Sequence, residues 1–189
     1  MPSCKRWLIV FVDRSVDVIR RLLRKVMFSR KCFAGFCIAM LVGMFLYAGC
    51  DTQEEQDDFA EQASRSPENI TRVDASGKIL SEDKDDWRTA PVYVGEIRVD
   101  PAMPNPAPIG DFITIRVTVT VFDAVYSPLR LRNLHDNRLQ TLSEIEQASD
   151  PGAYLFHVPV SLIGPVGLHR LLIFDGIGEI VSYGDVLAQ

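Results

Sequence analysis

The sequence predicts an all-β fold, in which an antiparallel β-sandwich of about seven strands follows a signal or anchor helix and a disordered acidic linker. Apolar and polar residues alternate over 112–122, which is typical of a half-buried strand. Other short segments rich in apolar residues lie at close spacing between residues 92 and 187, and no long helical pattern interrupts them. Many short strands without a long helix favour a sandwich of two sheets.

Charge is distributed unevenly along the 189 residues. The first 50 contain nine Lys or Arg and two Asp, so a net charge of -5 for the whole chain leaves -12 for the remainder. All four Cys also fall in this basic part, which excludes a disulfide-stapled domain, a zinc finger and a cysteine nucleophile from the rest. We expect no nucleic-acid partner, because neutralising phosphates requires a basic face.

Residues 1–49 have the pattern of a signal peptide with a long basic n-region. The stretch 32–49 has no charged residue and follows Arg30 and Lys31. As a helix it would be ~27 Å long, which is short for a membrane span and sufficient for a signal peptide. The basic flank predicts that the chain after residue 50 is exported. Met27 is a candidate start; alternatively, residues 1–26 form an amphipathic helix on the cytoplasmic membrane surface.

The end of this segment resembles the lipobox of bacterial lipoproteins. Ala48, Gly49 and Cys50 match that pattern, whereas Tyr47 stands where the family usually has Leu. The resemblance implies cleavage between Gly49 and Cys50, lipidation of Cys50 and a permanent anchor in membrane lipid, since two or three acyl chains hold a protein stably. In proteobacterial lipoproteins an Asp at the position of Asp51 signals retention at the inner membrane. The alternative is a single-pass anchor that is not cleaved.

Residues 50–89 are expected to form a flexible tether. Positions 51–89 hold twelve acidic and five basic residues, and their few apolar residues show no pattern. Such a segment cannot bury enough apolar surface to offset the entropy lost on ordering. Calcium binding is disfavoured, because the acidic runs lack the ligand spacing and central Gly of a loop site.

Residues 90–189 are expected to form the folded domain. Gly95 predicts a bulge, Pro159 predicts an edge strand, and 143–146 has the spacing of a helix capping box. Turns are predicted at 150–152 and 175–178. The expected strands cover 92–99, 112–122, 129–134, 139–142, 154–162, 168–174 and 179–187. The runs PNPAPIGD and GLHRLLIFDGIG are similar to those of immunoglobulin-like or fibronectin type III-like modules, which implies a sandwich of that type.

Candidate chemistry is sparse in this domain. His157 and His169 have no Asp or Glu at a ligand spacing, so we predict no metal site and no cofactor. Ser161 has no visible base, and no catalytic motif occurs, so we predict no enzymatic activity. One basic stretch could bind an anion or a partner, or could simply form the solvent face of a strand; its residues are Arg130, Arg132, His135 and Arg138.

The sequence therefore favours a bacterial lipoprotein that faces the periplasm or the cell exterior. Its β-sandwich would be a non-catalytic module that binds a protein partner in the cell envelope through end loops or sheet edges. Two alternatives remain open. One is an accessory subunit of a membrane complex, anchored by an uncleaved helix, and the other is a carbohydrate- or metal-binding surface domain.

Overall fold

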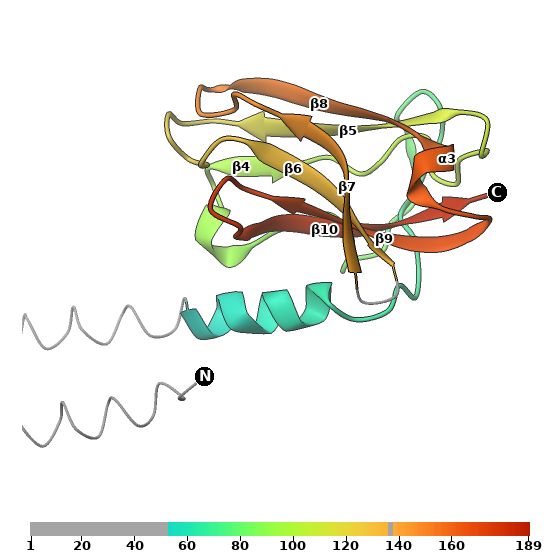
Figure 1. Ribbon diagram of the computed structural model, residues 1–189, viewed down its shortest axis with the longest axis horizontal. Coiled ribbons are helices and arrows are strands. Elements are labelled where there is room, and N and C mark those ends of the chain that lie inside the picture. The colour runs from blue at the N-terminus through green and yellow to red at the C-terminus, as the bar shows by residue number, and fades with distance from the viewer. Residues whose placement is uncertain (1–52, 136–137) are drawn as a thin grey trace, which may run out of the picture. The chain divides into compact units, whose positions relative to one another are not determined.

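The computed structural model describes residues 53–135 and 138–189, which form ten strands, two short helices and a helical segment at 53–63 (Figure 1). The two large sheets are antiparallel throughout, so the prediction of an all-β fold with antiparallel sheets is confirmed. The predicted signal segment, with Gly49, Cys50 and Asp51, lies outside the described residues. Among the helices of the described part, none is long and apolar enough to cross a membrane.

The larger sheet has five strands in the order β3-β10-β9-β6-β7. Its bounds are β3 Arg88–Thr89, β6 Leu129–His135, β7 Arg138–Ile145, β9 Gly167–Phe174 and β10 Ile180–Ala188. The predicted turn at 175–178 joins β9 to β10. The strands β9 and β10 are buried along almost their whole length, on both faces of the sheet. A strand covered on both faces needs few polar residues, as the LLIF run in β9 shows.

The smaller sheet has the order β4-β5-β8, with β4 Ile97–Val99, β5 Phe112–Val119 and β8 Gly152–Pro159. The alternation in β5 is confirmed, since Ile113, Ile115, Val117 and Val119 are at most 2% exposed. Pro159 lies on an edge strand, as predicted, where its missing N–H breaks no central ladder. A separate hairpin pairs β1 Arg72–Val73 with β2 Ile79–Ser81.

The two sheets face each other, and one apolar core lies between them (Figure 1). The small sheet contributes β-branched side chains together with Phe156, and the large sheet contributes Leu129, Leu131, Leu171 and Ile173, all fully buried. The sequence therefore folds as a sandwich because alternate residues of both sheets are apolar.

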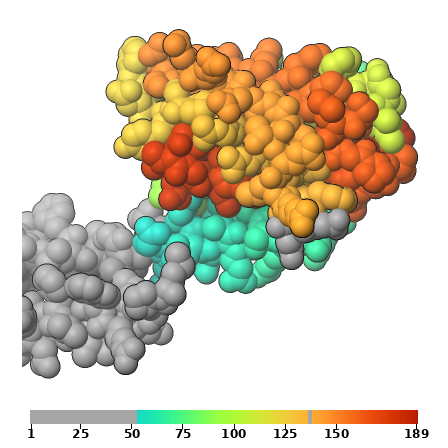
Figure 2. All heavy atoms as spheres, viewed as in Figure 1, coloured from blue at the N-terminus to red at the C-terminus, as the bar shows by residue number. Residues whose placement is uncertain are grey.

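The predicted flexible tether is wrong for residues 53–89. Residues 53–63 are helical, and Gln56, Phe59 and Ala63 are at most 5% exposed. These three positions recur at helical spacing, whereas the acidic residues of the same helix point outward to solvent. The composition of this segment did not reveal the pattern, because it counts the residues of the buried and the exposed face of the helix together. Figure 2 shows the segment after residue 52 packed along one side of the sandwich.

Three local predictions also differ from the structure. Residues 143–146 form no helical turn, because β7 continues to Ile145 in register with β6. The strand predicted over 154–162 stops at Pro159, where the short helix α3, Val160–Ile163, begins. Ser161 therefore lies on a helix, and it is exposed. Residues 92–96 are not a strand, because the 3-10 helix η1, Pro91–Tyr93, precedes β4. Gly95 lies in the link to β4 with a positive φ of 87°.

Candidate functional site

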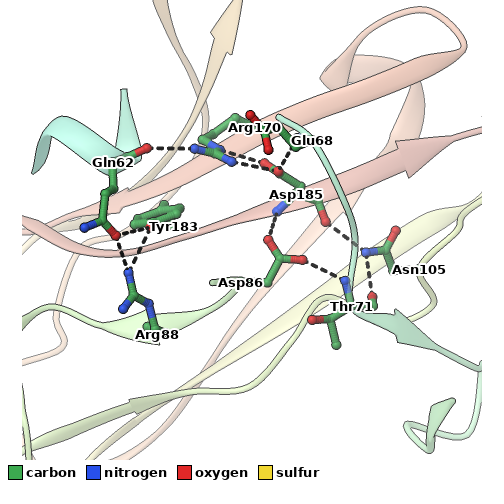
Figure 3. Close-up of polar contacts among 9 residues, drawn as sticks. All are labelled: Gln62, Glu68, Thr71, Asp86, Arg88, Asn105, Arg170, Tyr183 and Asp185. Atoms are coloured by element: carbon green, nitrogen blue, oxygen red, sulfur yellow. Dashed lines mark hydrogen bonds and ion pairs between the residues drawn. The ribbon is translucent and has the colours of Figure 1, made fainter. Parts of the chain in front are cut away.

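The outer face of the large sheet carries a polar cluster beneath residues 62–71 (Figure 3). Arg170 in β9 and Asp185 in β10 are direct cross-strand partners. Leu171 points into the core, so alternation along β9 directs Arg170 to the opposite face. The backbone carbonyl of Gln62 and the amide of Glu68 both bond to this pair, so the N-terminal segment closes over it.

Arg170 and Asp185 form a bidentate ion pair. The guanidinium Nε and Nη2 donate to the two carboxylate oxygens at 2.7 Å each, and the side chains are only 8% and 3% exposed. Nη1 donates to the Gln62 carbonyl at 2.9 Å, and the guanidinium carbon lies 4.9 Å from the centre of the Tyr183 ring. Burial alone would lower the pKa of Arg170, but the hydrogen bonds and charge of Asp185 raise it overall. Arg170 therefore stays charged, and its bidentate hydrogen bonds to Asp185 form a clamp between β9 and β10.

Asp86 joins this clamp to the incoming chain. One carboxylate oxygen accepts the Thr71 amide at 2.7 Å, and the other accepts the Asp185 amide at 2.9 Å. Asn105 donates to the carbonyls of Thr71 and Asp185, both at 2.9 Å, and accepts from the Leu187 amide at 3.0 Å. Burial raises the pKa of the Asp86 carboxyl to about 7, and the nearby Asp185 charge adds to the increase.

A second group fastens the helical segment at its other side. Arg88 donates to the Gln62 side-chain oxygen at 2.6 Å and to the Tyr183 hydroxyl at 3.2 Å. Phe59 packs on Tyr183 with ring centres 5.0 Å apart, and the Arg88 guanidinium lies over the Phe59 ring. The helix is therefore held by a tilted contact between two aromatic rings as well as by polar contacts.

These residues border an open hollow of about 430 Å³. No His or Cys is among its lining residues, which are Gln62, Arg65, Ser66, Glu68, Asn69, Asp83, Asp85, Asp86, Arg88, Arg170, Tyr183 and Asp185. In the described part of the chain, no three His, Cys, Asp or Glu residues are placed to hold a metal ion. The deepest arginine, Arg170, is already paired within the protein, so the cluster acts as a structural clamp.

The residues of the predicted basic patch make different contacts in the structure. Leu129 and Leu131 are buried, and the alternate Arg130 and Arg132 lie on the other face of β6. Arg130 pairs with Glu144 at 3.0 Å, and the Arg132 guanidinium lies 5.0 Å from the centre of the Phe174 ring. His135 and Arg138 are cross-strand partners at the tip of the β6–β7 hairpin, and both line a shallow hollow there with Leu139 and Gln140.

The histidines of β8 and β9 lie in different environments. His157 is exposed; its ring stacks on Phe112 at 4.6 Å between centres and lies 3.1 Å from the Thr114 hydroxyl. His169 is buried, and its Nε2 lies 2.7 Å from the Pro165 carbonyl oxygen. Each ring therefore has a local structural contact.

The connections at one end of the sandwich form a compact surface, which we call the loop end: segments 93–96, 120–128, 146–151 and 175–179. Backbone bonds join these segments, from the amide of Gly176 to the Tyr126 carbonyl at 2.6 Å and from the amide of Asp123 to the Ser149 carbonyl at 2.8 Å. Thr120 donates to the Glu96 carbonyl at 2.9 Å. The loop end is thus held together across four connections.

Asp175 organises the β9–β10 turn within the loop end. One carboxylate oxygen accepts the amides of Ile177, Gly178 and Glu179 at 2.9 to 3.1 Å. The other accepts the Tyr93 hydroxyl at 3.0 Å, and burial together with this bond raises the pKa of Tyr93. Gly176 packs so closely on the Ser127 carbonyl that a Cβ would overlap it. This turn therefore presents Ile177 in a defined position.

No protein-family model matches the chain, and no curated protein matches it. The candidate surfaces therefore rest on the chain's own residues.

Neither the clamp nor the loop end was predicted from the sequence. Arg170 and Asp185 are fifteen residues apart, and only the hairpin register brings them together. One available signal was the apolar run LLIF directly after Arg170, which is typical of a strand covered on both faces. A second was the helical spacing of Phe59 and Ala63.

We expect the protein to lose stability as the pH rises from about 4 to 7. The folded-state pKa of Asp86 is about 7 and its ordinary value is 3.8, so the folded chain holds the proton over this interval and the unfolded chain does not. The slope is at most ~1.4 kcal/mol per pH unit, and solvent contact reduces it. Urea unfolding at several pH values should show the decline.

Asp86→Asn should make the free energy of unfolding less dependent on pH over this interval. This expectation is independent of any loss of stability that is the same at every pH. Asp74→Asn is the matched control, because the hydrogen bond from the Ser76 side chain lowers the pKa of Asp74 below the interval. An unchanged slope in Asp86→Asn would contradict the assignment of this titration to Asp86.

Proposed function

We propose that the chain is a bacterial lipoprotein, anchored in the membrane through Cys50, whose sandwich is a non-catalytic interaction module outside the cytoplasm. The observation that carries this proposal is the small interval between the lipobox and the packed domain. The first described residue, Gln53, is already helical and lies three positions after Cys50 in the sequence, and Gln56 is buried against the domain. A cysteine anchor would therefore carry the module directly, without the long tether that the composition suggested.

We infer that the sandwich is of the immunoglobulin-like, fibronectin type III-like kind. The order β4-β5-β8 opposite β7-β6-β9-β10 corresponds to strands A, B and E of such domains opposite C′, C, F and G. His169, near the start of β9, bonds to the Pro165 carbonyl four residues upstream. Related domains use a Tyr for a similar contact at the start of strand F. Sandwiches of this kind bind partners through loops and edges, which supports a binding role.

The intact mass of the protein extracted from membranes tests the anchor. We expect a chain that begins at Cys50 and carries added acyl mass, and Cys50→Ala should remove both the cleavage and the added mass. Asp51→Asn, which leaves the cysteine in place, is the control for modification. A full-length chain without added mass would contradict lipidation and would support the alternative of an uncleaved anchor.

A further inference from the structure

The loop end exposes large apolar side chains that the core does not use. Val94, Phe122, Tyr126 and Ile177 are 69%, 72%, 62% and 65% exposed, and each belongs to one of the connections that define this end. The bonds among these connections hold the backbone in place. A set of exposed apolar residues on a fixed backbone is typical of an interaction site, because little ordering entropy is lost on binding.

The charges of the loop end have a single sign. Its four segments contain no Lys or Arg. They contain five exposed carboxylates, those of Glu96, Asp123, Glu146, Asp150 and Glu179. These five carboxylates, which we call the acidic rim, share the four connections with the exposed apolar residues, and together they are complementary to an apolar surface bordered by Lys or Arg. The same rim disfavours anionic lipid headgroups, and it disfavours the loop end of a second copy of this chain.

The first described residues of the helical segment lie near the loop end. Going along this helix, the Gln56 amide reaches the Ile180 carbonyl, Phe59 packs on Tyr183, and the Gln62 carbonyl reaches Arg170 opposite Asp185. The helix therefore runs in the same direction as β10, and its first residues lie nearest the β9–β10 turn (Figure 1). Three residues of chain span at most ~11 Å, so an anchored Cys50 keeps this end close to the bilayer.

We propose that the loop end is the docking surface for a membrane protein that presents an apolar patch bordered by Lys or Arg. The location of the partner rests on the proposed lipid anchor, whereas its surface chemistry follows from the exposed side chains and the acidic rim. Phe122 and Ile177 supply the apolar contact. Asp123 and Glu179, which neighbour them in the chain, supply the charge contact.

Photocrosslinking in intact cells tests the proposal with the full-length chain. We replace Phe122 with p-benzoylphenylalanine, and as a matched control Leu155, which is 54% exposed on the outer face of β8. We expect a discrete protein adduct from position 122 and none from position 155. The double substitution Asp123→Lys with Glu179→Lys should lower the yield at position 122 about ten-fold. Asp74→Lys with Asp85→Lys, away from the loop end, should leave it unchanged.

Several outcomes would overturn the proposal. These are adducts of lipid mass only, adducts of equal yield from position 155, no adduct at 122, and a yield that charge reversal leaves unchanged. Unfolding of each variant in urea verifies that the fold is retained. The mass at Cys50, measured on the same samples, reports the anchor separately. A lipidated chain without the position 122 adduct refutes docking alone, and an unmodified chain that still crosslinks refutes the lipid anchor alone.

Discussion

Replacement of Arg170 by Met is expected to lower the free energy of unfolding by about 3–5 kcal/mol. The substitution leaves the Asp185 carboxylate, 3% exposed, without its bidentate partner. It also removes the hydrogen bond that Arg170 donates to the Gln62 carbonyl. An unpaired buried charge is destabilising because the protein cannot replace the solvation that the carboxylate has in water. Urea denaturation followed by circular dichroism measures the change.

Arg130→Met is the matched control for this prediction. It removes the same side chain from the Arg130–Glu144 pair, whose members are 27% and 41% exposed. Because water solvates the remaining carboxylate, we expect a loss of at most ~1 kcal/mol. Equal losses in the two variants would show that the Arg170 pair is not buried as the structure has it. Asp185→Asn offers a second test, should Arg170→Met prevent folding.

The contact between Trp87 and Gly184 is expected to show the other large effect. Trp87 is 4% exposed, and its indole lies directly on Gly184 of β10, so that a Cβ at 184 would overlap the ring. Trp87→Ala should lower the free energy of unfolding by about 3–5 kcal/mol through loss of buried surface and a cavity. Gly184→Ala should lower it by about 1–3 kcal/mol, because the ring has to move.

The double variant distinguishes this contact from general damage. With the indole absent, the methyl group at 184 has room, so Gly184→Ala should have little further effect in the Trp87→Ala chain. The expected coupling is about 1–3 kcal/mol in a double-mutant cycle. Additive effects would mean that Gly184 is required for a reason other than the proximity of Trp87.

These contacts bear on function because they belong to the segment that the proposed anchor would hold. The helical residues, Trp87 and Asp86 all attach residues 53–89 to the large sheet. With the proposed anchor at Cys50, the short link would restrict the orientation of the domain, whereas a long coil would let it point in any direction. A fixed orientation is what a docking surface near the membrane requires.

The elements best predicted from the sequence are those with a local signal. The alternation in β5, the turn at 175–178 and the edge position of Pro159 were all readable from neighbouring residues. The helix at 53–63 was not predicted from neighbouring residues. Its few buried positions are stabilised by packing on the sheet and not by the local composition. In the same way, α3 replaced the end of a predicted strand, and β7 passed through a capping-box pattern because pairing with β6 outweighed local preference.

The sequence by itself determined the all-β class, the separation of a basic first quarter from an acidic remainder, and the cysteine pattern on which the anchor proposal rests. Each of these depends on residues adjacent in the chain or on a simple count. Only the tertiary structure decided that Arg170 meets Asp185, that residues 53–89 close over them, and that three connections with exposed apolar residues meet at one end of the sandwich. Those relations depend on strand register and on packing between distant segments, which no local pattern encodes.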